Sequence, residues 1–241
     1  MNEKKPFSFK NIANQLEDLK NFIPPINTAG YPFIILFALF ALILSLISDF
    51  LGWIGFILTL WCVYFFRDPE RVVPLGDDIL VSPADGLITN ISEHKEGKKN
   101  YTKVSIFLSV FNVHIQRLPV SGQITKIDYI EGKFINATLD KASEENERSR
   151  LTLKSGSNVI YITQIAGLIA RRIICYLKTN ERVNQGERYG IIKFGSRVDI
   201  EFPNSYNLMV SIGQQCIGGE TIIARDFKNN KNIQSREYKK I

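Results

Sequence analysis

The chain has 241 residues, of which 45% are hydrophobic and 22% are charged, enough for one sizeable domain with an appendage. Lys and Arg number 30 against 24 for Asp and Glu, and the resulting net charge of +6 favours anionic partners. Three scattered cysteines without a CxxC pair exclude a disulfide scaffold and a zinc ribbon, and two histidines argue against a multi-histidine metal centre.

The first predicted elements lie in a long apolar run. Between Lys20 and Arg67 the only charged residue is Asp49. Taken as one helix, the 34 residues from Phe33 to Phe66 would be roughly 50 Å long, which exceeds a hydrocarbon core of about 30 Å. The run therefore predicts two helices rather than one.

We expect a polar segment over residues 1–30, then a membrane-associated helical hairpin over 31–66 with Asp49 and Gly52 near its bend. Each helix is at the short end for a spanning helix, so a hairpin that crosses the bilayer and a re-entrant or interfacial hairpin both stay open. A buried hairpin in a soluble core is the third interpretation.

Basic residues lie on both sides of the hairpin, with four lysines before it and Arg67 and Arg71 after it. This pattern favours the cytoplasmic side for both ends of the hairpin and for the domain that follows, at the inner membrane. A reducing compartment agrees with unpaired cysteines. The basic surplus then favours anionic phospholipid over nucleic acid, because no RNP-type motif or zinc finger occurs.

From Asp78 onward, short runs rich in Ile, Val, Phe and Tyr are broken by Gly, Asn, Asp and Pro, which predicts strands and hairpins. The clearest runs are 102–115, 158–177, 189–195 and 197–203. Residues 141–150 form either a helix or a solvated loop. We expect a mainly β, β-rich α+β fold, in which residues 67–241 form a barrel-like or sandwich-like domain.

The pattern Pro-x-x-Gly-x-Ile-Thr-x-Ile occurs twice, in residues 81–91 and 117–127, with an offset of 36 residues. Proline followed by glycine before an alternating run predicts a turn that leads into a strand, so we expect two quasi-symmetric units. A third segment, 210–224, resembles the hammerhead turn of biotinyl and lipoyl carrier domains. It lacks a lysine to carry the cofactor, so the likeness is architectural.

Ser196 follows Gly195 between two strand-like runs. In a strained turn, its hydroxyl can attack the carbonyl of Gly195 and convert the amide to an ester. Elimination would then cut the chain and leave dehydroalanine, which hydrolyses to a pyruvoyl group. The dipeptide alone is not specific, because a lone serine is usually a turn or cap residue.

Four segments together resemble one family. They are FFRDPER (65–71), SPADG (82–86), FNVHIQRLPVSG (111–122) and RYGIIKFGSRVDIEFP (188–203). In this order they are similar to the short bacterial (type A) branch of the pyruvoyl-dependent phosphatidylserine decarboxylase proenzymes. The segments DKASEENER (140–148), QIAGLIARRI (164–173) and GGET near the C-terminus fit the same pattern. The resemblance covers the chain from about Tyr31 onward.

The resemblance implies self-cleavage between Gly195 and Ser196, which gives a large chain of residues 1–195 and a small chain of residues 196–241. These two chains would form a heterodimer, alone or within a higher oligomer. Ser196 would become a pyruvoyl group that binds the serine amine of the substrate as a Schiff base and withdraws electrons as CO2 leaves. No metal or diffusible cofactor is implied.

Two further residues receive roles from the resemblance. His114 matches the family histidine near the reacting carbon, and we assign it to protonating the carbanion left by decarboxylation. A core histidine is the alternative. Asp85 matches the aspartate that is thought to help activate the serine for self-cleavage. It is otherwise an ordinary turn residue, because the second copy of the repeat carries Ser121 there.

The longer branch of the family has a second histidine three residues after the position of His114, where this chain has Arg117. A guanidinium stays protonated and cannot act as a general base, so a complete Ser-His-Asp triad is not carried over. Arg117 and Arg197 are instead candidates for binding the carboxylate or phosphodiester of the substrate. A structural salt bridge is the alternative for either arginine.

These observations predict a membrane-anchored enzyme that converts phosphatidylserine to phosphatidylethanolamine at an anionic membrane surface. Three alternatives stay open. The first is a decarboxylase of a related serine phospholipid, and the second is a non-enzymatic, membrane-anchored β adaptor. The third is a Ser-His hydrolase that uses Ser196 and His114 without self-cleavage.

Overall fold

The computed structural model describes residues 24–97, 99–133, 145–167, 172–193, 195–226 and 237–241. These residues divide into two compact units, the first ending at Glu70 and the second running from Arg71 to Ile241, which are described separately. Residues 1–23 of the expected polar segment 1–30 lie outside the described residues.

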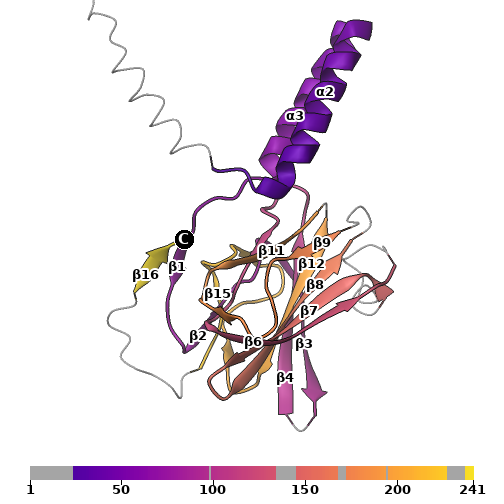
Figure 1. The fold of residues 1–241 in the computed structure, drawn as a ribbon. Coiled ribbons are helices and arrows are strands. Elements are labelled where there is room, and N and C mark those ends of the chain that lie inside the picture. Colours follow the sequence, from indigo (N-terminus) through magenta and orange to yellow (C-terminus); the bar gives the residue numbers. More distant parts are fainter. Residues whose placement is uncertain (1–23, 98, 134–144, 168–171, 194, 227–236) are drawn as a thin grey trace, which may run out of the picture. The chain divides into compact units, whose positions relative to one another are not determined.

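The first unit contains a helical hairpin (Figure 1). After a 3-10 turn, Thr28–Gly30, it consists of α2, Tyr31–Ile47, and α3, Asp49–Phe65. The helices are separated by Ser48 alone, whose backbone is extended. The bend therefore lies next to Asp49 and four residues before Gly52, near the two residues that the sequence predicted. By length and composition, Thr28–Ile47 is long and apolar enough to cross a membrane, whereas α3 is shorter.

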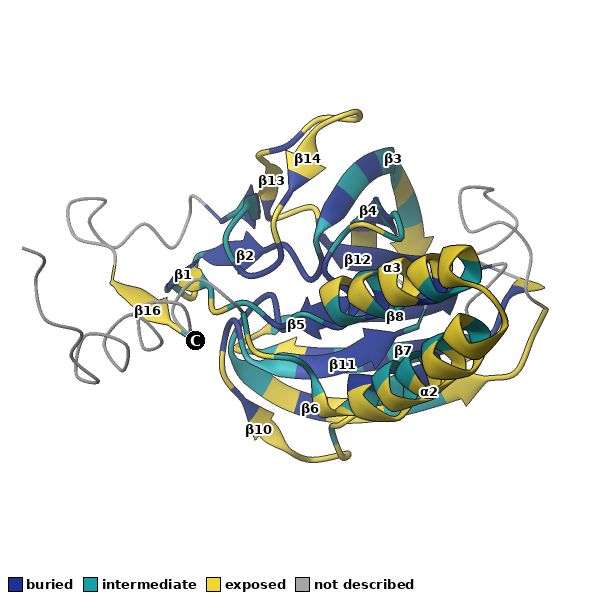
Figure 2. Ribbon diagram, turned by 90° about the horizontal axis from the view of Figure 1, so that it is seen from above, coloured by how far each residue is buried: buried dark blue, intermediate teal, exposed yellow. Residues whose placement is uncertain are grey.

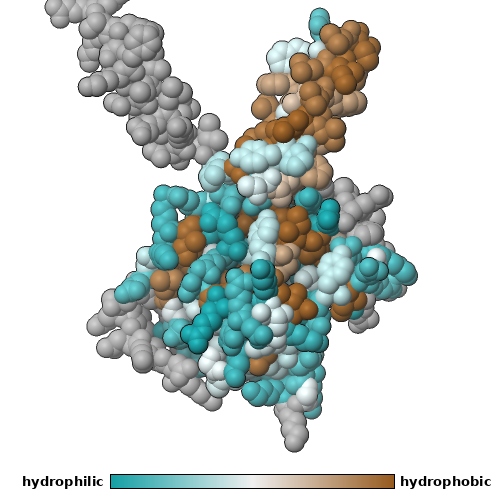
Figure 3. Space-filling view, viewed as in Figure 1, coloured by the Kyte–Doolittle hydropathy of each residue, from teal (hydrophilic) through white to brown (hydrophobic). Residues whose placement is uncertain are grey.

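Small residues bring the two helices together. A Cβ atom at Gly55 would lie 2.6 Å from the Ala41 Cα atom, and one at Gly52 would lie 2.7 Å from the Ser45 Cβ atom. Such small-residue contacts are typical of helices that pack in membranes. Large apolar side chains on both helices stay exposed, and α2 has no buried residue (Figures 2 and 3). These surfaces differ from those of a hairpin buried in a soluble core.

The second unit is built on a curled, antiparallel eight-stranded sheet with the order β10-β6-β7-β8-β12-β4-β3-β14. Its strands are β3 Gly86–Glu96, β4 Lys99–Leu108, β6 Gly122–Ile130, β7 Arg148–Ser155, β8 Asn158–Ala166, β10 Arg182–Val183, β12 Ser196–Pro203 and β14 Gln215–Cys216. The smaller sheets contain β5 Ile115–Arg117, β11 Arg188–Ile192 and β9 Ile173–Cys175, then β13 Asn207–Leu208, β15 Ile222–Arg225 and β2 Ile79–Val81, and finally β1 Val72–Pro74 with β16 Tyr238–Lys240. The prediction of a helical hairpin that is followed along the chain by a mainly β fold is confirmed.

Three predicted elements have different bounds in the structure. The run 102–115 is interrupted after Leu108 because the Asn112 side chain accepts hydrogen bonds from the Ser109 N–H (2.9 Å) and hydroxyl (2.8 Å), which closes a turn. The run 158–177 contains both β8 and β9. A helix or a loop was predicted over 141–150, and residues 141–144 of this range lie outside the described residues. The prediction of a helix is wrong for residues 148–150, because they begin β7.

The repeated motif produces a quasi-two-fold arrangement. The Val81 N–H donates to the Pro119 carbonyl, and 36 residues on, the Arg117 N–H donates back to the Pro83 carbonyl, both at 2.9 Å. In each copy, the glycine of the motif begins a long strand, β3 or β6. The prediction of two quasi-symmetric turn-into-strand units is therefore confirmed.

Strand β12 lies between β8 and β4 and is buried along its whole length (Figure 2). Val198, Ile200 and Phe202, which alternate along this strand, belong to the main hydrophobic core. Alternate residues of a strand point to opposite faces, so Ser196 lies on the core-facing side of the sheet. The first residue of the predicted small chain thus occupies one end of a central strand.

Candidate active site

Ser196 is the first residue of β12 and pairs with Leu108 on one side and Ala166 on the other. Gly195 has a φ of +66°, in the left-handed region that glycine adopts without steric cost. Ser196 is fully buried, and its hydroxyl has no hydrogen-bond partner among the described residues. Leaving a buried polar group unsatisfied costs about 1–3 kcal/mol, so the hydroxyl is not placed there for stability.

His114 lies at the same end of the sheet as Ser196. Two connections run there between the main sheet and the three-stranded sheet. One leads from β4 to β5, and the other leads from β11, the partner of β5, to β12, the partner of β4. The first runs from Leu108, the register partner of Ser196, to Ile115. The second returns from β11, which pairs with β5 through Ile191 and Ile115. His114 immediately precedes β5, so the topology brings the predicted histidine and serine into one region.

The imidazole of His114 has a defined orientation. The residue is fully buried, and its Nδ1 atom lies 2.9 Å from the carbonyl oxygen of Asn112. A carbonyl can only accept a hydrogen bond, so Nδ1 carries a hydrogen and donates it. Nε2 is then the ring atom that is left to exchange a proton with another group.

Asp85 also lies at this end of the sheet. Leu87 pairs with Phe107, and Phe107 pairs with Arg197, so the beginning of β3 lies level with the beginning of β12. Adjacent strands are about 4.8 Å apart, which places the backbone before β3 roughly 10 Å from Ser196. The register therefore brings three sequence-predicted residues, Ser196, His114 and Asp85, to one end of the second unit.

Arg71 and the main chain of Gly218 hold the carboxylate of Asp85. Nη2 of Arg71 lies 2.7 and 3.0 Å from its two oxygens, and the Gly218 N–H donates to Oδ1 at 2.8 Å. Glycine allows this approach, because a Cβ atom at position 218 would lie 3.2 Å from that oxygen. The sequence placed Arg71 on the basic flank of the hairpin and in the motif 65–71, but assigned it no role in the site. Its contact with Asp85 could have been suspected, because both residues lie in motifs that resemble the same family.

The second copy of the repeat shows what Asp85 contributes beyond its turn. At the equivalent position, the Ser121 hydroxyl accepts a hydrogen bond from the Gln185 N–H at 2.9 Å. This contact corresponds to the one between Gly218 and Asp85. A neutral hydroxyl is therefore sufficient to cap the turn, and the negative charge of Asp85 is an additional feature of the first copy.

The two arginines predicted as substrate ligands make internal contacts. Nη1 of Arg117 donates to two main-chain carbonyls at 3.0 and 3.3 Å, and the residue is buried. Arg197 forms a two-point ion pair with Asp199, at 2.6 and 3.0 Å, and donates to the Ser105 hydroxyl at 2.8 Å. These contacts support the structural alternative for both residues.

A cysteine lies beside Asp85 but is poorly suited to act as a nucleophile. Cys216 pairs with Gly86, and its thiol lies 3.3 Å from the Gly86 carbonyl oxygen. Burial raises the pKa of the Cys216 thiol to about 11. The thiol is therefore neutral near pH 7, and only a thiolate is strongly nucleophilic.

Within the described residues, no group of three or more His, Cys, Asp or Glu side chains is arranged to hold a metal ion.

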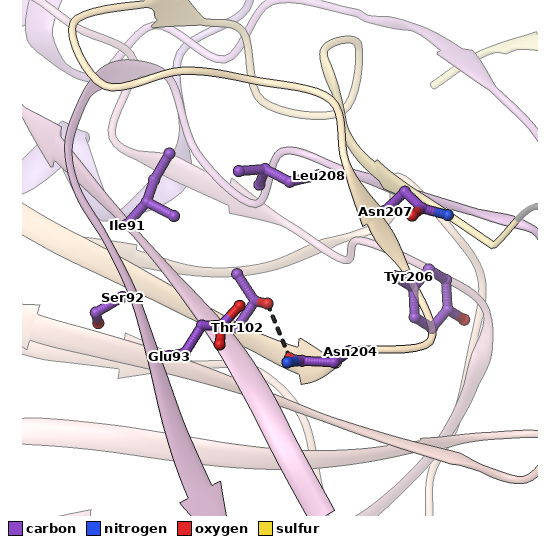
Figure 4. A pocket seen from close by; sticks show the side chains of 8 residues that line it. All are labelled: Ile91, Ser92, Glu93, Thr102, Asn204, Tyr206, Asn207 and Leu208. Carbon is purple, nitrogen blue, oxygen red and sulfur yellow. Dashed lines mark hydrogen bonds between the residues drawn. The ribbon is translucent and has the colours of Figure 1, made fainter.

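A cavity of about 350 Å³ lies elsewhere on the second unit (Figure 4). It is lined by Ile91, Ser92, Glu93, Thr102, Asn204, Tyr206, Asn207 and Leu208. The Thr102 hydroxyl donates to Asn204 Oδ1 at 3.0 Å, and Thr102 pairs with Phe202. At about 3.3 Å per residue, this end of β12 is roughly 20 Å from Ser196. The cavity is separate from the candidate active site.

A family model described as phosphatidylserine decarboxylase matches residues 58–224. The matched range covers more than half of the chain. It includes Ser196, His114 and Asp85, together with Arg71 and Gly218.

Proposed function

The chain belongs to the phosphatidylserine decarboxylase family, a family of carboxy-lyases, and on this basis we propose that it uses a pyruvoyl group made from its own Ser196. The proposed reaction converts phosphatidylserine to phosphatidylethanolamine at a membrane surface. The observation that carries the proposal is the buried hydroxyl of Ser196, which lacks a partner among the described residues and directly follows a left-handed glycine. Membership of the short bacterial branch stays a prediction.

The proposed self-cleavage begins when Ser196 Oγ attacks the carbonyl carbon of Gly195. The peptide C–N bond breaks as its nitrogen takes up a proton, which leaves an ester and a free amine. Removal of the Ser196 Cα proton then breaks the Cβ–O bond and releases the Gly195 carboxylate. The resulting dehydroalanine tautomerises and is hydrolysed, so that water enters, ammonia leaves, and a pyruvoyl group remains at the start of the small chain.

The carboxylate of Asp85 is proposed to assist this cleavage. Support comes from the repeat, because Ser121 caps the equivalent turn without a charge. Support also comes from the pair of contacts that Arg71 and Gly218 make, which fix the direction of the carboxylate. A positioned base contributes typically 10²–10⁴-fold to a proton transfer.

The residues at the site fit a pyruvoyl group, since that group needs no ligands beyond the chain that forms it. Its precursor hydroxyl is buried and has no hydrogen-bond partner among the described residues. Once formed, the group supplies an electron sink for the loss of CO2. His114 then supplies a proton from Nε2 to the carbon that lost CO2. The hydrogen bond from its Nδ1 to the Asn112 carbonyl holds the ring in the orientation that this transfer requires.

The helical hairpin is proposed to hold the enzyme at the inner membrane, with the second unit in the cytoplasm. The length and composition of Thr28–Ile47 and the exposed apolar surfaces of α2 and α3 support this anchor. The net charge of +6 favours the anionic surface in which the substrate lies.

Two of the alternatives from the sequence do not agree with the family, since an inactive adaptor and a Ser-His hydrolase are not carboxy-lyases. Decarboxylation of a related serine phospholipid would use the same chemistry, because the reaction takes place at the headgroup. No contact among the described residues favours such a lipid over phosphatidylserine.

Intact-mass analysis of the purified protein tests the proposed function. We expect two chains that separate between Gly195 and Ser196, with the small chain lighter by the mass of NH3 than a serine-initiated peptide. The control variant Ser196→Ala is expected to stay uncut and to release no CO2 from phosphatidylserine. A wild-type chain that decarboxylates the lipid while intact would contradict the proposal.

A further inference from the structure

Two buried glutamines connect His114 to the main sheet. Gln164 in β8 donates from Nε2 to Oε1 of Gln116 in β5 at 3.0 Å. Gln116 in turn donates from Nε2 to the carbonyl oxygen of His114 at 2.7 Å. Both side chains are fully buried. The chain of hydrogen bonds therefore joins the three-stranded sheet, which follows His114, to the eight-stranded sheet that contains Ser196.

The orientation of both amides follows from this chain of bonds. The His114 carbonyl can only accept, so Gln116 must present its NH2 group there and its oxygen to Gln164. Gln164 must then present its own NH2 group to Gln116. Gly190 leaves room for this contact, because a Cβ atom at that position would lie 2.8 Å from Gln164 Nε2. The amide of Gln164 thus has one orientation that satisfies its neighbour.

This orientation leaves Gln164 Oε1 buried and without a partner among the described residues. An unsatisfied acceptor costs about 1–3 kcal/mol, which an apolar side chain of similar size would avoid. Gln164 pairs with Val198, two residues from Ser196 on the same face of the sheet. Such diagonal neighbours are about 7–8 Å apart. Stability alone therefore does not explain a glutamine next to the candidate nucleophile.

We propose that Gln164, acting through Gln116, is a positioning residue that fixes the main chain of His114 relative to Ser196. The proposal rests on the catalytic role of His114 given under the proposed function. The bond from Nδ1 to Asn112 sets the direction of the ring, whereas the glutamine pair sets its distance from β12. A displacement of about 1 Å at a reacting group can lower a rate about 100-fold.

Nuclear magnetic resonance of the histidine rings tests the positioning directly. The chain has only two histidines, His94 and His114, so their ¹⁵N-labelled rings are readily assigned. In the uncut Ser196→Ala background, Gln164→Met is expected to shift the ring signals of His114 and to leave those of His94 unchanged. Gln116→Met breaks the same link and is expected to give the same shift, which provides a second variant should the first fail to fold.

Gln185→Met is the matched control. Gln185 is also buried, and its side chain donates to the Ile79 and Pro119 carbonyls at 3.3 and 3.1 Å and accepts from the Gly76 N–H at 3.0 Å. Its replacement removes at least as many hydrogen bonds, yet it should leave the signals of His114 in place. If His114 is unchanged in Gln164→Met and Gln116→Met, or shifts equally in Gln185→Met, the inference is overturned.

Kinetics on the self-cleaved enzyme provide a second readout. Gln164→Met is expected to lower kcat by about 10- to 100-fold with little change in KM. Added to His114→Ala, it should lower the residual turnover no further, because both changes remove the same contribution. A further loss of full size would show a general structural effect and overturn the inference. An uncut, inactive wild-type chain would instead overturn the proposed function, while the resonance experiment would still test the positioning.

Discussion

At the scale of single residues, the internal repeat separates what a turn needs from what a reaction needs. Asp85 and Ser121 occupy equivalent positions, and each accepts one main-chain N–H at 2.8 or 2.9 Å. Only the aspartate carries a charge, and only its motif lies at the end of the sheet where Ser196 begins. The second copy therefore serves as a reference, within the same molecule, for the structural part of the role of Asp85.

The comparison of Asp85 with Ser121 predicts the behaviour of the variant Asp85→Ser. We expect the variant to fold, because serine caps the same turn in the other copy, but to cut itself at least about 100-fold more slowly because the carboxylate is missing. Loss of the ion pair with Arg71 should lower thermal stability modestly. A time course of intact mass after expression measures the cleavage.

Ser121→Ala is the matched control, since it removes the equivalent cap from the second copy. It should reduce stability by about 1 kcal/mol and leave the cleavage rate unchanged. Cleavage of Asp85→Ser at the wild-type rate would remove Asp85 from the proposed mechanism.

At the scale of elements, the hairpin and the strands illustrate different limits of sequence patterns. The near absence of charge predicts the hairpin, and the bend lies at Ser48, next to Asp49, because one extended residue is enough to separate α2 from α3. The apolar run 102–115 is broken by a turn that Asn112 closes with its side chain. Hydropathy indicates where apolar segments lie, whereas local side-chain hydrogen bonds decide where they end.

The exposed apolar surface of the hairpin predicts tight membrane retention. We expect the full-length protein to stay with membranes in alkaline carbonate and in high salt, and to be released by detergent. The double variant Leu39→Asp and Ile57→Asp places charges on exposed positions near the middle of both helices. Each charge costs roughly 3 kcal/mol in the centre of a bilayer, so retention should weaken.

Leu208→Asp is the control for this experiment, because it adds a charge to an exposed apolar position of the second unit. It should leave membrane retention unchanged. Recovery of the wild-type protein in the carbonate supernatant would contradict the proposed anchor.

At the scale of the whole molecule, the proposed cut would fall immediately before a central strand. Residues 196–241 contain β12, which pairs with β4 and β8 of the proposed large chain along most of its length. The same residues also contain β14, β15 and β16, which pair with β3, β2 and β1. The 46 residues of the small chain, 241 − 195, would therefore remain held by hydrogen bonds and by core packing after the peptide bond is cut.

This arrangement predicts that the two chains copurify as a heterodimer. In detergent, we expect one peak in size-exclusion chromatography that contains both chains in equal amounts, and separation only after denaturation. The uncut Ser196→Ala protein should elute at the same volume, because the fold does not depend on the cut bond. Loss of the small chain under native conditions would contradict this prediction.

The sequence by itself determined the apolar hairpin, the β-rich body, the repeat and the family, because each depends on residues close together in the chain or on motifs in a fixed order. Only the tertiary structure decided which side chains meet. Arg71 reaches Asp85 across 14 positions, and Gln116 reaches Gln164 across 48. Local patterns do not specify strand order or register, and these two properties determine such contacts. The contacts of Arg117 with the Gly186 carbonyl and of Arg197 with the Ser105 hydroxyl, which support a structural role for both arginines, were hidden for the same reason. The ion pair of Arg197 with Asp199 is local, because the two residues are two positions apart on one strand.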